Sequence, residues 1–464
     1  MKHKKGIHFE VSERKILLRI MDLVMVFFGV YLLNSISSFN YLPFTEQSII
    51  PLVLLGIYVT IFGTVFELYD LQQASKLDIT TRNIVLTISV LVLFYLLTPF
   101  LSPVLPEERI QILFFYLTLI ASIFLWRVAY TQLIESPRFY KRILLVGDVS
   151  NIDGLVRSLN NSDPNYKIVG FLNSEASDNE RITYKGLKEF PSQDFLEVIQ
   201  KENISEVVVA SFNTEAMVSE VYHDLILLLE RGFKIRDYSQ VYEELLQRVP
   251  IQFVGKDFYK YFPYSRSNEN KLYRFFQRTI DIIFSMIGLI FGLVILPLVY
   301  LGNVIGNKGP IFYIQERIGR NSKPFKIYKF RTMVVNAEKD GVKWAEKGDK
   351  RITRFGRFLR GSRIDEIPQF YNVLRGDMSI IGPRPERPFF VNELSRIIPF
   401  YEMRHIIKPG LTGWAQVNAR YGSSIDDSLT KLQYDLYYIK HRSLFIDFSI
   451  IIKTLSTVLY YRGQ

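Results

Sequence analysis

The chain has 464 residues, which is enough for two or three domains. Its composition is 48% hydrophobic, 14% aromatic and 22% charged, which excludes a disordered chain and is unusual for a purely soluble enzyme. The formal net charge is +11, and there is no cysteine, so disulfides, thiolate metal sites and cysteine nucleophiles are excluded. Residues 270–464 hold 31 Lys and Arg against 16 Asp and Glu, which indicates a polyanionic partner for this part.

Four apolar runs open the chain and predict four transmembrane helices within residues 1–135. They are Ile16–Ile36, Ile49–Phe66, Ile84–Leu101 and Ile110–Trp126. The last three contain no charge and have about the minimum length of a spanning helix. Four buried helices of a soluble core are the alternative, which the number of runs disfavours. Lys and Arg before the first run and after the last one predict that both ends of the bundle are cytoplasmic.

A fifth apolar run, Ile282–Leu301, has no charge over its 20 residues. Basic residues flank it on both sides, from Lys271 before it to Lys308 after it, so the positive-inside rule places both ends in the cytoplasm. Pro297 lies inside the run, where it removes a backbone donor and bends or breaks a helix. The pattern therefore favours a re-entrant helix that breaks at Pro297, and a spanning helix remains the alternative.

Residues 138–255 alternate between strand and helix patterns, which predicts a doubly wound, Rossmann-like α/β domain. The expected strands are Ile143–Gly147, Lys167–Leu172, Glu206–Ala210 and Phe233–Ile235, and the expected helices are Ile152–Leu159, Gln193–Lys201 and Glu215–Arg231. After Gly147 the second and third glycines of a dinucleotide fingerprint are not in place. A structural or regulatory role, with a degenerate nucleotide site, is therefore favoured over nucleotide binding.

A strongly basic stretch follows the fifth run: residues 317–363 hold 15 Lys and Arg and four acids. A solvated face or a face on anionic lipid would explain the cations, but not the adjacent Asp365 and Glu366. Arginine forks suit phosphate oxygens, and two carboxylates can hold Mg²⁺ or supply a nucleophile and a metal ligand. These residues predict phosphate chemistry at a membrane surface. Asp435 and Asp447 are predicted to be helix caps or ion-pair partners rather than metal ligands.

Four motifs in this part resemble those of a known family. They are KFRTM at Lys329–Met333, DKRITRFGRFLR at Asp349–Arg360, IDEIPQFYNVLRGDMSIIGPRP at Ile364–Pro385 and KPGLTGWAQVN at Lys408–Asn418. The sequence resembles the bacterial sugar transferases, monotopic phosphoglycosyl transferases that act on polyprenyl phosphate. The resemblance implies a mostly α-helical catalytic domain with a re-entrant membrane helix over residues 270–464. It also implies the four-helix and Rossmann-like segments of the long members of this family.

The resemblance implies a reaction and assigns residues to it. A UDP-hexose, with glucose as the first expectation, would donate hexose 1-phosphate to undecaprenyl phosphate and release UMP, as the first membrane step of exopolysaccharide, capsule or O-antigen synthesis. Asp365 would attack the sugar-side phosphorus and form a covalent phosphosugar, and Glu366 would bind Mg²⁺. Arg360 and Arg384 match residues that bind phosphate. The other candidates for substrate binding lie in the same motifs: Lys329, Arg331, Arg351 and Gln369.

The expected location is the bacterial cytoplasmic membrane, in a multi-pass protein whose catalytic domain lies on the cytoplasmic side. Undecaprenyl phosphate, a UDP-hexose, membrane lipid and, by resemblance, a second copy of the chain are the expected partners. Nucleic acid is not expected, because the basic surplus adjoins a membrane segment. A membrane glycosyltransferase that releases UDP is the nearest alternative, although the chain has no D-x-D motif. A polysaccharide-assembly scaffold is another, but it would not need Asp365 and Glu366.

Overall fold

A computed structural model describes residues 11–36, 39–74, 77–133, 140–147, 152, 156, 166–173, 187–210, 219–251, 270–337, 349–419, 422 and 424–459. The chain divides into two compact units, Met1–Leu246 and Gln247–Gln464. This boundary falls inside the predicted middle domain, since Val249 and Ile251 are buried in the core of the second unit. The domain limits expected from the sequence otherwise stay a prediction.

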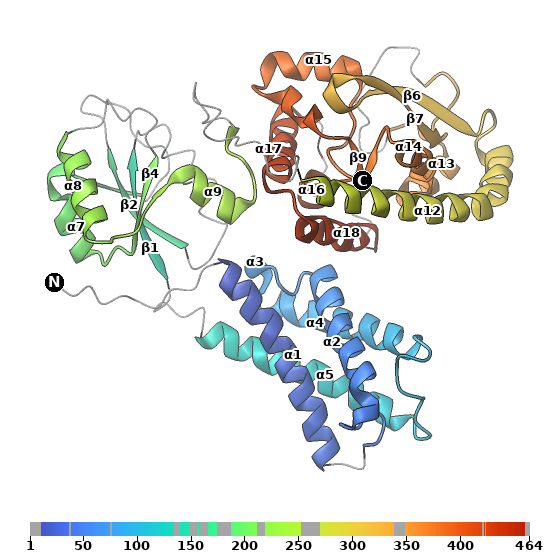
Figure 1. Ribbon diagram of the computed structural model, residues 1–464, viewed down its shortest axis with the longest axis horizontal. Helices are drawn as coiled ribbons and strands as arrows, with labels where there is room; N and C mark the ends of the chain where they lie inside the picture. The colour runs from blue at the N-terminus through green and yellow to red at the C-terminus, as the bar shows by residue number, and fades with distance from the viewer. Residues whose placement is uncertain are drawn as a thin grey trace. The chain divides into compact units, whose positions relative to one another are not determined.

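The first unit begins with a helical bundle (Figure 1). Its elements are α1 (Val11–Ile36), η1 (Glu46–Ser48), α2 (Ile49–Val65), α3 (Leu71–Ala74), α4 (Leu77–Leu96) and α5 (Ile110–Leu133). Helix α1 packs against α5, α2 against α4, and α4 against α5. The four long helices are long and apolar enough to cross a membrane, which confirms the four apolar helices expected from the sequence.

A fully buried ion pair joins the first and last long helices of this bundle. Arg127 Nη2 lies 2.7 Å from Asp22 Oδ2, and both side chains are 0% exposed. The ring of Tyr69, from the segment after α2, lies beneath the guanidinium groups of Arg19 and Arg127, 5.2 and 5.8 Å from its centroid. Charged residues are costly in a membrane bundle unless they pair, so this contact explains how α1 accommodates Asp22.

Removing one member of this pair should destabilise the bundle, because the other charge is left buried without its counter-charge. We expect Asp22→Ala to lower the free energy of unfolding by about 3–5 kcal/mol, measured by unfolding of the purified protein in detergent. The double variant Asp22→Ala, Arg127→Leu should recover most of this loss. Equal stability of Asp22→Ala and the unsubstituted protein would contradict the structural role of the pair.

The remainder of the first unit is built on a five-stranded parallel sheet of order β3-β2-β1-β4-β5. The strands are β1 (Lys141–Gly147), β2 (Tyr166–Asn173), β3 (Lys188–Phe190), β4 (Glu206–Ala210) and β5 (Ile235–Asp237), and the other elements are η3 (Ser192–Asp194), α7 (Phe195–Lys201), α8 (Ser219–Glu230) and α9 (Tyr238–Leu246). The central strand is β1, and its Leu144 and Val146 are fully buried.

The predicted alternation of strands and helices is confirmed in outline. The strand expected at 233–235 begins two residues later, at Ile235, and the short β3 and α9 were not predicted. Of the helix expected over Ile152–Leu159, only Ile152 and Val156 are described, both helical and buried. The incomplete glycine fingerprint after Gly147 lies outside the described residues.

The second unit is mostly helical and contains two small sheets (Figure 1). Its helices are α12 (Lys271–Gly306), η5 (Arg320–Ser322), α13 (Arg354–Gly361), η6 (Ile364–Glu366), α14 (Gln369–Arg375), α15 (Pro388–Ile397), η7 (Tyr401–Ile406), α16 (Trp414–Asn418), α17 (Ile425–His441) and α18 (Leu444–Leu459). Strands β6 (Phe312–Ile318) and β7 (Pro324–Phe330) form an antiparallel hairpin, and β8 (Ser379–Ile381) pairs in parallel with β9 (Gly410–Thr412).

Helix α12 is a fifth helix long and apolar enough to cross a membrane, and one side of it is docked on the second unit along its whole length. Near its start, Tyr273 donates a hydrogen bond to Asp447 of α18 (2.6 Å). About two turns further on, Asp281 accepts from the backbone N–H of Ile380 (2.8 Å). The opposite side is apolar and exposed; Leu293 and Val294 are each 69% exposed.

Glycines allow the second half of α12 to approach its neighbours closely. A Cβ added at Gly288 would lie 2.4 Å from the ring of Phe370 in α14, and one at Gly302 would lie 2.3 Å from the ring of Phe355 in α13. A Cβ added at Gly292 would likewise lie 2.8 Å from the side chain of Ile367, the residue after Glu366. The helix therefore supports the elements that carry the predicted site.

Pro297 does not end the helix, which continues to Gly306. The last turns of α12 nevertheless run in a different direction from the rest, at the right-hand end of the helix in Figure 1. Proline removes one backbone donor and bends a helix more readily than it terminates one when the following residues can continue the turn. Helix α12 is thus continuous through the position of the expected break, Pro297.

Candidate active site

Asp365 and Glu366 lie in η6, a single helical turn between α13 and α14. The preceding residue, Arg363, has a φ of 59°, in the left-handed region that residues other than glycine rarely adopt. This conformation redirects the chain between the two helices, so that the two carboxylates face cationic side chains from β7 and from the turn after β8. Strained backbone of this kind persists where the surrounding structure enforces it, commonly at functional sites.

Glu366 is held by three cationic groups. Its carboxylate oxygens lie 2.8 Å from Arg384 Nη2, 3.3 Å from Lys329 Nζ and 3.4 Å from Arg363 Nη1. Burial alone would raise the pKa of Glu366, but Arg384, Lys329 and Arg363 outweigh burial and hold this pKa well below its usual range. Glu366 is therefore a fixed, ionised carboxylate.

Asp365 has a different environment although it is adjacent in the chain. Its side chain is buried, and its Oδ1 atom has no hydrogen-bond partner among the described residues. Burial, reinforced by the negative charge of Glu366, raises the pKa of Asp365 above its usual range, against the opposing effect of Lys329 and Arg360. A buried oxygen without a partner is costly, so it indicates a group kept available for a ligand or a reaction.

Arg360 and Gln369 accompany this pair. Arg360 Nε donates to Thr332 Oγ1 (2.9 Å), and its charge acts on Asp365. Gln369 is the first residue of α14, one turn after Asp365, and it is 3% exposed. Its Nε2 atom also has no hydrogen-bond partner among the described residues. The site thus contains an unpartnered acceptor and an unpartnered donor, both buried.

Two other residues predicted to bind substrate, Arg331 and Arg351, make their described contacts away from Asp365 and Glu366. The buried guanidinium of Arg331 donates to the carbonyl oxygens of Asn307, Pro310 (2.7 Å) and Met333 (3.0 Å), beyond the C-terminal end of α12. Arg351 is paired with Asp349, with a shortest distance of 2.6 Å. The described contacts bring neither guanidinium to Asp365 or Glu366, and the binding roles expected for them stay predictions.

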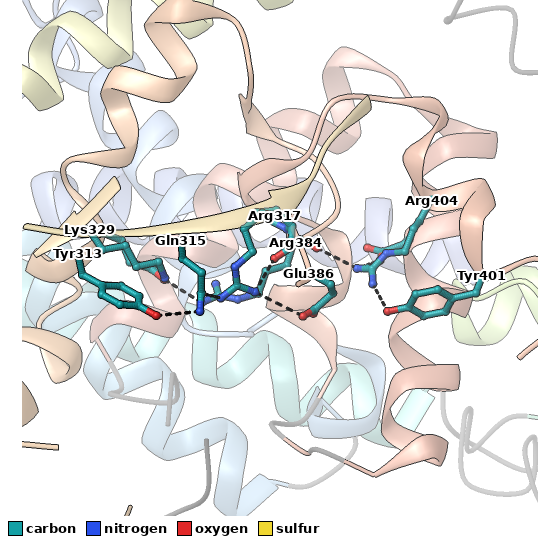
Figure 2. A network of polar contacts seen from close by, with 11 residues as sticks. Tyr313, Gln315, Arg317, Lys329, Arg384, Glu386, Tyr401 and Arg404 are labelled. Carbon is teal, nitrogen blue, oxygen red and sulfur yellow. Dashed lines mark hydrogen bonds and ion pairs between the residues drawn. The ribbon is translucent and has the colours of Figure 1, made fainter. Parts of the chain in front are cut away.

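The turn Pro383–Glu386 presents Arg384 to Glu366, and two arginines outside the predicted set support this turn. Arg317 of β6 donates to the carbonyl oxygen of Pro385 (3.1 Å), and Arg404 of η7 donates to that of Arg384 (3.2 Å). Figure 2 shows these side chains in one polar network with Lys329, Glu386 and Tyr401. Arg317 and Arg404 belong to no motif that sequence spacing distinguishes. Arg363 could have been found, because it precedes Glu366 by three residues on a basic run.

Among the described residues, no group of three or more His, Asp or Glu side chains is arranged to hold a metal ion. Asp365 and Glu366 can still supply the one or two carboxylates with which proteins commonly hold Mg²⁺ when substrate phosphates complete its shell. Four cationic side chains act on this pair: Lys329, Arg360, Arg363 and Arg384. The surplus of positive charge disfavours a bare cation and suits a metal that arrives with a diphosphate.

Buried carboxylates, converging cations and an apolar supporting helix are a combination suited to binding phosphate groups next to a membrane. The family model for the bacterial sugar transferases matches residues 272–461. The chain is 45% identical over 141 residues to a Bacillus subtilis (strain 168) protein named for undecaprenyl-phosphate N-acetylgalactosaminyl 1-phosphate transfer, and this match covers 30% of the chain and 79% of that relative. The chain therefore belongs to the bacterial sugar transferase family.

Two further relatives carry different sugars in their names. The chain is 38% identical over 255 residues to a UDP-N-acetylgalactosamine-undecaprenyl-phosphate N-acetylgalactosaminephosphotransferase of Aeromonas hydrophila, covering 55% of the chain and 59% of the relative. It is 41% identical over 184 residues to a UDP-glucose:undecaprenyl-phosphate glucose-1-phosphate transferase of Klebsiella pneumoniae, covering 39% of each. The matches thus cover less than two thirds of the length of each of these two relatives.

The two uses of arginine in this unit can be separated experimentally. Arg331→Met should lower the free energy of unfolding by about 3 kcal/mol, because buried carbonyl oxygens lose a charged donor. The fraction that remains folded should keep its activity per molecule, measured as nucleotide released from a UDP-sugar. A variant that is as stable as the unsubstituted protein but inactive would instead place Arg331 in substrate binding, as the sequence predicts.

Proposed function

We propose that this protein transfers sugar 1-phosphate from a UDP-sugar to undecaprenyl phosphate and releases UMP. The observation that carries the proposal is the contrast within the pair: an ionised Glu366 held by three cations beside a buried Asp365 with a free oxygen. Family membership supports the same reaction. The donor is a UDP-hexose or UDP-N-acetylhexosamine, and glucose remains one candidate beside galactose and N-acetylgalactosamine.

The geometry supports a two-step reaction. Asp365 Oδ1 would attack the sugar-side phosphorus of the donor, the bond from that phosphorus to the bridging oxygen would break, and UMP would leave with that oxygen. A phosphate oxygen of undecaprenyl phosphate would then attack the same phosphorus and release the Asp365 carboxylate. Lys329, Arg360 and Arg384 would neutralise the phosphate oxygens in both steps.

Mg²⁺ fits this site as a cofactor. Glu366, with Asp365 beside it, would hold the ion, which would offset negative charge on the donor diphosphate. The chain's own residues act independently of the ion. Arg384, Lys329 and Arg363 fix the Glu366 carboxylate, and burial keeps water from the Asp365 oxygen.

A monotopic, re-entrant arrangement of α12 accounts for its packing better than a spanning one. Elements that carry polar and charged side chains lie against α12 along most of its length. The contacts extend from Tyr273, which donates to Asp447, to Gly302, which lies against the ring of Phe355. If α12 crossed the bilayer, α13 and η6 would be drawn into the hydrocarbon with it, at a high cost for each buried charge. With both ends of α12 on the cytoplasmic side, the apolar face enters the lipid and the site stays at the interface.

The rest of the chain fits a multi-pass protein of the bacterial cytoplasmic membrane. We infer that the four long helices of the first unit span the bilayer and that the catalytic unit lies on the cytoplasmic side, where nucleotide sugars occur. The strand order β3-β2-β1-β4-β5 supports a Rossmann-like middle domain. The incomplete glycine fingerprint favours a structural or regulatory role for it.

The re-entrant arrangement can be tested directly, because the chain has no cysteine. Lys271→Cys and Lys308→Cys place single thiols at exposed positions before and after the apolar part of α12. We expect a membrane-impermeant maleimide to label both variants only when the cytoplasmic face is open, in inverted vesicles. Labelling of the two positions from opposite faces would establish a spanning helix and contradict the proposal.

The nature of the released nucleotide tests the reaction. The full-length protein with Mg²⁺, undecaprenyl phosphate and one of UDP-glucose, UDP-galactose or UDP-N-acetylgalactosamine should release UMP with one donor. Asp365→Asn should lower the rate by about 10⁴-fold, as loss of a covalent nucleophile does. Asp377→Asn, which alters a carboxylate paired with Arg375 in the same unit, is the matched control and should keep the rate.

Release of UDP would contradict this mechanism and establish a glycosyltransferase. No release with any donor from folded protein would overturn the proposed activity with these sugars and favour a scaffold role. If Asp365→Asn still released UMP at the full rate, the overall reaction would be supported and Asp365 would not be its nucleophile.

A further inference from the structure

The turn that carries Arg384 is held at every carbonyl group. The four consecutive carbonyl oxygens of Pro383, Arg384, Pro385 and Glu386 each accept a hydrogen bond from a different residue. The donors are Gly410 N (2.8 Å), the Arg404 guanidinium (3.2 Å), the Arg317 guanidinium (3.1 Å) and Ile318 N (2.9 Å), in that order. Two of these donors are main-chain groups, and two are side chains of buried or half-buried arginines.

Local covalent geometry restricts the same turn. Pro383 and Pro385 fix φ on either side of Arg384 and have no N–H to donate. A Cβ at Gly382 would lie 2.4 Å from the carbonyl oxygen of Lys408, so only glycine fits at this position without a shift of the backbone. With both ends fixed, the direction of the Arg384 side chain depends on where its own carbonyl group is held.

Arg404 supplies that restraint from a buried position. It is 5% exposed, its Nη1 donates to Tyr401 Oη (2.7 Å), and its Nη2 lies 2.8 Å from Asp435 of α17. The same Nη2 donates to the carbonyl of Arg384 (Figure 2). A buried ion pair contributes little net stability compared with apolar packing of the same volume, so its presence indicates a positional role.

We propose that Arg404 is a positioning residue that acts through the main-chain carbonyl of Arg384 to hold the Arg384 guanidinium against Glu366. Asp435 and Tyr401 fix Arg404 in turn, and Arg317 is the corresponding restraint one residue further along the turn. This inference rests on the proposed function, because Arg384 is there a phosphate-binding group. A lysine cannot replace Arg404, since one ammonium group cannot serve the hydroxyl, the carboxylate and the carbonyl in the planar arrangement of a guanidinium.

A double-substitution cycle tests this role in the full-length protein. The rate of UMP release is measured for the unsubstituted protein, Arg404→Lys, Arg384→Ala and the protein with both substitutions. We expect Arg404→Lys to lower kcat by about 30-fold, within the range that misplacement of a site group by about 1 Å produces. Once Arg384 is alanine, Arg404→Lys should change kcat by less than about twofold, because the group it positions is gone.

A matched control separates positioning from general support of the fold. Arg278 is half-buried and also donates to two main-chain carbonyl oxygens, those of Val373 (2.7 Å) and Leu374 (2.6 Å), at the end of α14. Arg278→Lys should keep kcat within about twofold even where it lowers thermal stability. Multiplicative losses from Arg404→Lys and Arg384→Ala would overturn the proposal, since Arg404 would then act independently of Arg384.

Failure of the positioning role and failure of the proposed function give different results in these measurements. If the unsubstituted protein releases no UMP, the proposed function fails, and the same four proteins are compared by calorimetric affinity for UDP, where additive losses overturn the positioning role. If Arg404→Lys does not fold, Tyr401→Phe replaces it, because it removes one partner of Arg404 and keeps both charges of the Arg404–Asp435 pair. A Tyr401→Phe cycle with additive losses would likewise overturn the proposal.

Discussion

The second unit depends on a helix that has two unlike sides. Helix α12 presents glycines and a few polar groups to the unit and apolar side chains to its surroundings, over 36 residues. A straight helix of that length would measure about 54 Å, well beyond the roughly 30 Å hydrocarbon thickness of a bilayer. In the proposed re-entrant arrangement, the change of direction near the end of α12 and its docking on the unit solve the same problem, because the apolar surface would enter lipid while the charged elements on the other side remain in water.

The site derives its chemistry from an asymmetry between two neighbouring carboxylates. Glu366 receives three cations and stays ionised, whereas Asp365 is buried with an oxygen that nothing among the described residues engages. Neighbouring carboxylates with pKa values driven apart by their surroundings are typical of paired roles in catalysis. The left-handed Arg363 makes this possible, because it redirects the chain so that residues adjacent in sequence meet different environments.

Sequence patterns predicted the parts of this protein that depend on local composition. Apolar runs located the bundle helices and α12, and alternation located β1, β2 and β4. Sequence patterns could not show that Arg331 donates to carbonyl oxygens beyond the end of α12, or that Arg404 donates to a carbonyl oxygen of the turn after β8. An arginine that donates to main-chain carbonyl groups has no characteristic sequence spacing. A break was expected at Pro297, whereas α12 continues to Gly306, because the effect of a proline depends on whether its neighbours support a continuing helix. The short β3 depends on pairing with β2, which local sequence does not encode.

The same constraints explain why the supporting residues matter as much as the reacting ones. Ile367 packs against Gly292 of α12, and this contact fixes the position of η6 on that helix. The turn Pro383–Glu386 is set instead by β6, β9 and η7, through four carbonyl contacts. Glu366 and Arg384 meet at 2.8 Å only because two independently fixed elements converge there. In the proposed reaction, a nucleotide sugar from water and a phosphate from lipid would require a site whose charges do not move as either one enters, and fixing both elements separately supplies that rigidity.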